Sequence, residues 1–259
     1  NKLKYGLVSA NLAETYIEIC EFQKAFDLVN ISKIIFTELN NNDELIETLL
    51  LEAKLYFVIA NMNAFRKTVE NIQQYFPIKN KRGKLLLQLY SLFLDKINTD
   101  SWDLEKMNII KKELSLNNDR LLAAELQFIL ADEYNKKNEF GISISLLHSK
   151  MLTDICEFNT KYEAHRLYLL SKIPTKYQSD LLLTKNYLLQ KSYSMLHNNS
   201  ITELSLKVLK DLSLFYYERG NSIKAKEYAS FSEAIIEYIA TETISENEVS
   251  PFFERKMKK

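Results

Sequence analysis

The sequence predicts an all-α protein in which about six antiparallel helix pairs stack as a solenoid. Four tyrosines, Tyr16, Tyr56, Tyr134 and Tyr216, are separated by 40, 78 and 82 residues, which are multiples of about 40. Apolar residues recur at intervals of three and four nearly throughout, which is the pattern of amphipathic helices. The chain of 259 residues has only 4 glycines and 3 prolines, too few for the turns of a β-rich protein. A fixed period of this size is typical of helical repeat proteins, in which each unit packs on its neighbours.

The apolar pattern predicts twelve helices in six pairs. The first three pairs are expected at 5–20 and 22–40, 43–60 and 62–75, and 80–97 and 101–115. The last three are expected at 119–137 and 139–155, 159–173 and 179–197, and 200–218 and 222–240.

Capping and helix-breaking residues separate these segments. The polar run 40–43 supplies side chains that cap the following helix. Pro77 ends the second pair and Pro174 divides the fifth, because proline cannot continue a helix. Gly220 can adopt a positive φ at a helix end, and Ser222 is expected to cap the next helix. Further capping segments are expected at Asp100-Ser101, 117–119 and Ser179-Asp180.

The chain shows no linker rich in glycine, serine or proline, so residues 1–240 are expected to form one continuous array. Residues 241–259 are polar and end in a basic cluster, which indicates a tail or a linker to a further domain. Because the chain begins with asparagine, we expect it to be a fragment of a longer protein.

The composition excludes several classes of function. Lys+Arg and Asp+Glu both number 34, so no overall field favours nucleic acid or an anionic membrane. No apolar run approaches the ~20 residues that span a bilayer, and no signal segment is apparent. Cys20 and Cys156 lie in apolar helical segments without C-x-x-C spacing. We therefore expect reduced, buried thiols and a cytoplasmic location.

No residue pattern indicates catalysis, a cofactor or a metal. His148, His165 and His197 lie in separate helices without H-x-x-x-H spacing, and surface or interhelical roles are expected for them. The sequence contains no G-x-S-x-G motif, no phosphate-binding glycine loop and no dinucleotide fingerprint. The chain is therefore predicted to be non-enzymatic.

The tyrosine frames carry a resemblance to a known family. The last pair reads Leu212, Ser213, Tyr216, Gly220, Ala225, Ala229 and Ser232, and it resembles a tetratricopeptide repeat. The other matching pairs supply Leu12, Ala13, Tyr16, Cys20 and Ala25; Ala53, Tyr56 and Ala60; and Leu130, Ala131, Tyr134, Asn138 and Ser143. Phe65 stands where a small residue is expected, and the third and fifth pairs lack the signature. The spacing of about 40 resembles long-repeat variants of the family rather than the usual 34.

The resemblance implies a right-handed superhelix whose concave groove is lined by the first helix of each pair. Its implied groove positions are Glu14, Ile17, Leu50, Lys54, Phe57, Phe128, Asp132, Asn135, Lys210, Leu214 and Tyr217. This mixture of aromatic, aliphatic and charged side chains suits an amphipathic helix or an extended peptide. Ala10 and Glu14 occupy the positions at which relatives that clamp a C-terminal carboxylate carry lysine and asparagine, so that subtype is not expected.

Three functions are compatible with this sequence. The first is a scaffold or adaptor that binds a protein or peptide segment in its groove. The second is a sensory or regulatory solenoid that gates an attached effector in a signalling or transcription-regulatory protein. The third is a structural spacer or oligomerisation module. The sequence names neither the partner nor the oligomeric state.

Overall fold

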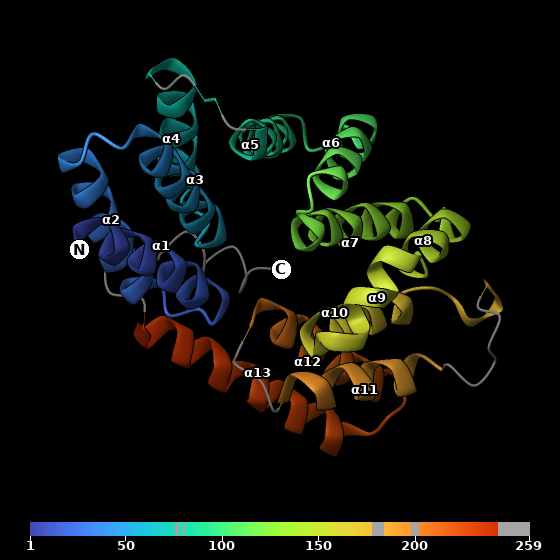
Figure 1. The fold of residues 1–259 in the computed structure, drawn as a ribbon. Coiled ribbons are helices and arrows are strands. Elements are labelled where there is room, and N and C mark those ends of the chain that lie inside the picture. Colours follow the sequence, from blue (N-terminus) through green and yellow to red (C-terminus); the bar gives the residue numbers. More distant parts are fainter. Residues whose placement is uncertain (76–77, 80, 178–183, 198–201, 243–259) are drawn as a thin grey trace. The chain divides into compact units, whose positions relative to one another are not determined.

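The structure is a computed structural model that describes residues 1–75, 78–79, 81–177, 184–197 and 202–242. These residues form α-helices, one short 3-10 helix and no strand, which confirms the predicted all-α class (Figure 1). The first seven helices are α1 Lys2–Glu18, α2 Phe22–Glu38, α3 Asn42–Val58, α4 Met62–Tyr75, α5 Lys81–Thr99, α6 Leu104–Leu116 and α7 Arg120–Lys136. The remaining elements are α8 Phe140–Leu147, α9 Lys150–Phe158, α10 Thr160–Ser171, η1 Thr175–Tyr177, α11 Lys185–His197, α12 Glu203–Glu218 and α13 Ser222–Glu242.

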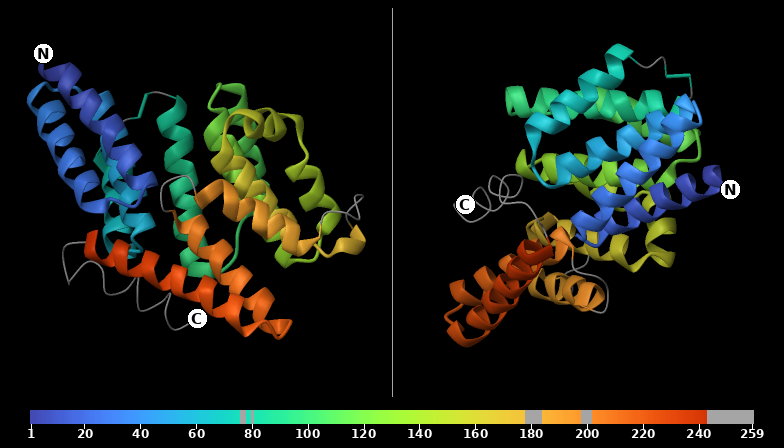
Figure 2. Two further views of the ribbon diagram at one scale, coloured as in Figure 1. Left: turned by 90° about the horizontal axis from the view of Figure 1, so that it is seen from below. Right: turned by 90° about the vertical axis from the view of Figure 1, so that its left-hand side faces the viewer.

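The helices group into two compact units. The first contains Asn1–Asp103 together with the end of α13 from Glu237, and the second contains Leu104–Ile236. In the first unit each helix from α1 to α4 contacts the next one, and α3 also contacts α1 and α5. In the second unit the same sequential contacts run from α6 to α12, and α7 also contacts α10. Figure 2 shows the antiparallel arrangement clearly for α1 and α2 (dark and mid blue). Each unit therefore buries its apolar faces between helices that are near in sequence.

The four periodic tyrosines mark four equivalent turns. Each tyrosine lies two residues before the end of its helix, in α1, α3, α7 and α12. Its carbonyl oxygen accepts a hydrogen bond from the backbone N–H five residues later. These N···O distances are 2.9 Å for Glu21 to Tyr16, 2.9 Å for Asn61 to Tyr56, 2.8 Å for Glu139 to Tyr134 and 3.0 Å for Asn221 to Tyr216. This bond is the signature of the Schellman motif, which satisfies carbonyls at a helix end.

The residue four positions after each tyrosine has a positive φ, as that motif requires. The angles are 63° at Cys20, 60° at Ala60, 61° at Asn138 and 74° at Gly220. Only one of these four is glycine, the residue that adopts this conformation without steric cost. The four tyrosines thus mark turns of the same geometry, which also recurs after Phe36 and Leu114.

The residue nine positions after each tyrosine lies in the helix that follows the turn, and its side chain is buried. Ala25, Phe65, Ser143 and Ala225 are all buried. The three small residues suit close helix crossings, whereas Phe65 stacks within an aromatic cluster. Its ring centroid lies 5.3 Å from that of Phe57 and 5.7 Å from that of Tyr90. The second pair thus accommodates a large residue where a small one is expected.

One predicted helix is wrong, because the segment 139–155 forms two helices. Helix α8 ends at Leu147, and α9 begins at Lys150 after Ser149 takes an extended conformation with ψ 143°. The buried Gln127 side chain of α7 donates from Nε2 to the Leu146 carbonyl at 2.6 Å and to the Ser149 hydroxyl at 2.5 Å. These bonds satisfy polar groups that a continuous helix would satisfy internally, and they stabilise the break.

Several predicted boundaries also change. Helix α6 begins at Leu104, whereas the sequence predicts a start at 101. The cap of α13 comes from Asn221, whose Oδ1 accepts from the Lys224 N–H at 3.1 Å, and not from Ser222. Asn41 caps α3 as expected, accepting from the Glu44 N–H at 3.4 Å. Pro77, the predicted cap Ser179-Asp180 and the tail from 243 lie outside the described residues.

Candidate functional site

The predicted groove positions differ in their accessibility. Ile17, Leu50, Phe128 and Asn135 are buried. Phe57 is half-buried, and its ring stacks on that of Phe93 at a centroid distance of 4.6 Å. These five side chains contribute to the packing between helices, and their place in a binding groove stays a prediction.

In the first unit, two groove positions pair with each other. Lys54 Nζ of α3 lies 3.1 Å from Glu14 Oε1 of α1. In the same way Arg82 of α5 lies 2.9 Å from Glu47 of α3. Alternate helices are thus linked by ion pairs that are partly exposed, a kind of pair worth about 0–1 kcal/mol. The charges of these four side chains are therefore neutralised within the protein.

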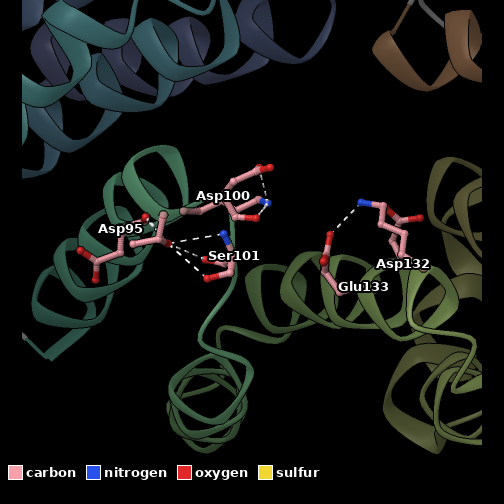
Figure 3. Close-up of polar contacts among 8 residues, drawn as sticks. Asp95, Asp100, Ser101, Asp132 and Glu133 are labelled. Carbon is pink, nitrogen blue, oxygen red and sulfur yellow. Dashed lines mark hydrogen bonds and ion pairs between the residues drawn. The ribbon is translucent and has the colours of Figure 1, made fainter.

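In the second unit, Asp132 is compensated within its own helix. Lys136 Nζ lies 2.8 Å from Asp132 Oδ2 and 2.7 Å from Glu133 Oε1. Figure 3 draws the Glu133 contact, together with the cluster at the end of α5, in which the Thr99 hydroxyl donates to the Asp95 carbonyl at 2.7 Å. Burial lowers the pKa of Lys136, but the hydrogen bonds and charges of the two carboxylates outweigh it and raise this pKa overall.

A buried asparagine and a half-buried histidine join α7 to α10. Asn135 Nδ2 donates to the Leu169 carbonyl at 3.2 Å. The His165 ring stacks on Phe128 at a centroid distance of 4.2 Å. Burial, with a smaller contribution from the charge of Lys207, lowers the pKa of His165 to about 3. This imidazole is therefore neutral at pH 7 and fills an interhelical space, one of the two roles expected from the sequence.

The last three groove positions form one exposed stripe. Lys210, Leu214 and Tyr217 occupy positions i, i+4 and i+7 of α12, which share one helix face. Lys210 is exposed, and the side chains of Leu214 and Tyr217 are 48% and 71% exposed. We call these three residues the α12 stripe. Among the eleven predicted positions, Leu214 and Tyr217 are the exposed large apolar side chains.

The sequence analysis missed a pocket of about 470 Å³. It lies where α10 ends, between η1, the start of α11 and the end of α12. Its walls comprise Ser171, Lys172, Ile173, Pro174, Thr175, Thr184, Lys185, Asn186, Phe215 and Arg219. The available signals were Pro174 and the loss of the tyrosine frame in the fifth pair. They mark an irregular connection but carry no indication of a cavity.

The cysteines occupy positions unsuited to chemistry. Cys20 and Cys156 are buried and form no disulfide, as predicted. Burial, followed by the charge of Glu163, raises the pKa of Cys156 to about 12, so the nucleophilic thiolate is not populated at pH 7. Within the described part of the chain, no group of three or more His, Cys, Asp or Glu side chains is arranged to hold a metal ion.

No described helix combines the length and the apolar character needed to cross a membrane.

Comparisons with protein-family models, with curated proteins and with solved structures found no match.

Proposed function

We propose that this chain is a non-enzymatic scaffold or adaptor, a right-handed TPR-like solenoid with long repeats that binds a protein or peptide segment. The four equivalent tyrosine turns support the repeat assignment. Contacts between helices that are not consecutive, α1 with α3, α3 with α5 and α7 with α10, support stacking, because in a solenoid each pair buries its apolar face on the next.

The α12 stripe is the observation that carries the binding role. A folded protein gains nothing in stability from a tyrosine that is 71% exposed, whereas tyrosine is enriched among residues that dominate binding energy. Leu214 extends the apolar area along the helix, and Lys210 adds a positive charge at its other end. This chemistry fits a peptide segment that has an apolar anchor flanked by an acidic residue.

Two side chains of types common in catalysis, Cys156 and His165, are held in unreactive states, which agrees with a binding role. The Cys156 thiol remains protonated because its pKa is raised to about 12. The His165 imidazole, with its pKa lowered to about 3, is too weak a base for efficient proton transfer at pH 7.

A selection from a random peptide library tests this proposal. We expect the protein to enrich peptides that carry an apolar residue next to Asp or Glu. The double variant Leu214→Ala/Tyr217→Ala should lose this enrichment, because truncating central aromatic and aliphatic anchors costs more than 1 kcal/mol each where they dominate an interface.

Phe158→Ala is the matched control. Phe158 is 90% exposed on α9 in the same unit and lies outside the predicted groove positions. The substitution removes one exposed aromatic side chain outside the α12 stripe and should leave the enrichment unchanged. Enrichment of no peptide class, or equal loss in the control, would contradict the proposal.

A further inference from the structure

The pocket at the end of α10 is lined by the described residues on both sides of the connection between α10 and α11. Helix α10 ends at Ser171 and α11 begins at Lys185, with η1 between them. The turns after the periodic tyrosines need only three residues, as at 219–221 between α12 and α13. Long connections within a regular helical array are where binding sites concentrate.

The wall of this pocket is positively charged. Lys172, Lys185 and Arg219 come from three different parts of the fold, and the described residues that line the pocket include no Asp or Glu. The Lys172 ammonium is paired with the Asp211 carboxylate of α12, which leaves the charges of Lys185 and Arg219. Two cations facing one cavity match the two negative charges of a phosphate monoester at pH 7, whose second pKa is about 6.

The floor of the pocket is apolar and the guanidinium at its edge is oriented. Ile173 and Phe215 are buried, and the guanidinium carbon of Arg219 lies 3.7 Å from the centre of the Phe215 ring. This stacking restricts the side chain, so less conformational entropy is lost when the guanidinium binds an anion. A volume of about 470 Å³ lies within the usual range of sites for small molecules.

We propose that this pocket binds a small organic phosphate, with the phosphate on Lys185 and Arg219 and an apolar part of the ligand over Ile173 and Phe215. The site is separate from the α12 stripe and does not depend on the proposed peptide binding. Such a ligand would join the ends of α10 and α12 to the start of α11 within the second unit.

Isothermal titration with phenyl phosphate, in a buffer that contains no phosphate, tests the site. We expect saturable binding with one ligand per chain. Inorganic phosphate should bind at least several-fold more weakly, because it lacks the apolar part, and phenol should not bind measurably, because it lacks the charge. Lys185→Gln and Arg219→Gln should each raise the dissociation constant about tenfold, since each removes a charge-assisted hydrogen bond.

Lys176→Gln is the matched control, because Lys176 is an exposed cation of the same connection that does not line the pocket. It should bind phenyl phosphate like the parent protein. Circular dichroism melting of each variant establishes that it is folded, and the Lys185 and Arg219 variants test the site independently. Absence of saturable binding, unchanged affinity in both variants, or equal affinity for inorganic phosphate would overturn the proposal.

Discussion

Replacing Gly220 with alanine isolates the backbone requirement of the turn that follows Tyr216. Gly220 has φ 74°, and a β-carbon built at this position meets no heavy atom within 4 Å. The cost of Gly220→Ala is therefore the left-handed conformation alone, about 1–2 kcal/mol. The lower entropy of the unfolded alanine chain offsets about 0.4–1 kcal/mol of it. We expect a net loss of about 1 kcal/mol in the free energy of unfolding of the second unit.

Gly141→Ala is the control within the same unit. Gly141 lies inside α8, and its added β-carbon also meets no atom within 4 Å. Because this backbone is helical, alanine should stabilise the unit by about 0.5–1 kcal/mol. Urea unfolding followed by circular dichroism measures both changes. Effects of the same sign in the two variants would refute the assignment of a left-handed turn at Gly220.

Three further substitutions test the packing and the charge states. Ala60→Gly should stabilise the first unit by roughly 0.5–1 kcal/mol, because Ala60 holds a φ of 60° that glycine adopts without strain; a lower urea midpoint would contradict this. Gly6→Ala should destabilise it by about 1–3 kcal/mol, because the new β-carbon would lie 2.9 Å from the buried Phe36 ring. Gly6→Ala should cost less in a Phe36→Leu background than in the parent protein, and an equal cost in the two backgrounds would argue against the clash. Because the pKa of His165 is lowered from 6.5 to about 3, the unfolded state binds a proton in this window that the folded state does not. Stability should therefore fall as the pH drops from 6.5 towards 3, and His165→Phe should make this decline shallower; an unchanged slope in pH-dependent melting would contradict the burial of a neutral imidazole.

The sequence predicted the helices well because their signals are local. Apolar spacing and capping residues act within a few positions of the chain, so most of the expected segments recur in the structure. The break between α8 and α9 was not predictable in this way, because it depends on Gln127, which lies about twenty positions earlier and donates to Leu146 and Ser149. Hydrogen bonds between side chains and groups so far apart in the chain produce no periodic pattern in the sequence.

The candidate surface was predicted less well, for a reason that lies in the packing. Helix α7 contacts α10 as well as α8, so its face towards the predicted groove is partly covered by the next first helix. Phe128 and Asn135 are buried in that contact, whereas Leu214 and Tyr217 of α12 remain exposed. The repeat pattern predicts which helices line a groove, but the contact between α7 and α10 decides which side chains of α7 are accessible.

The turns show both what a pattern reveals and what it hides. A glycine at position 220 predicts a positive φ, and asparagine at position 138 tolerates this conformation better than most residues. Cys20 and Ala60 give no such local signal, although their φ values of 63° and 60° are nearly the same as that of Asn138, 61°. Only the shared distance from a tyrosine identifies all four positions as equivalent.

The binding role is tested most directly by titrating a peptide enriched in the library selection against the parent protein and Leu214→Ala/Tyr217→Ala, with Phe158→Ala as the control. The account predicts that the double variant weakens binding at least tenfold, while its melting temperature and that of the control stay close to the parent value. An affinity unchanged by the double variant would contradict the claim that the α12 stripe forms the binding surface.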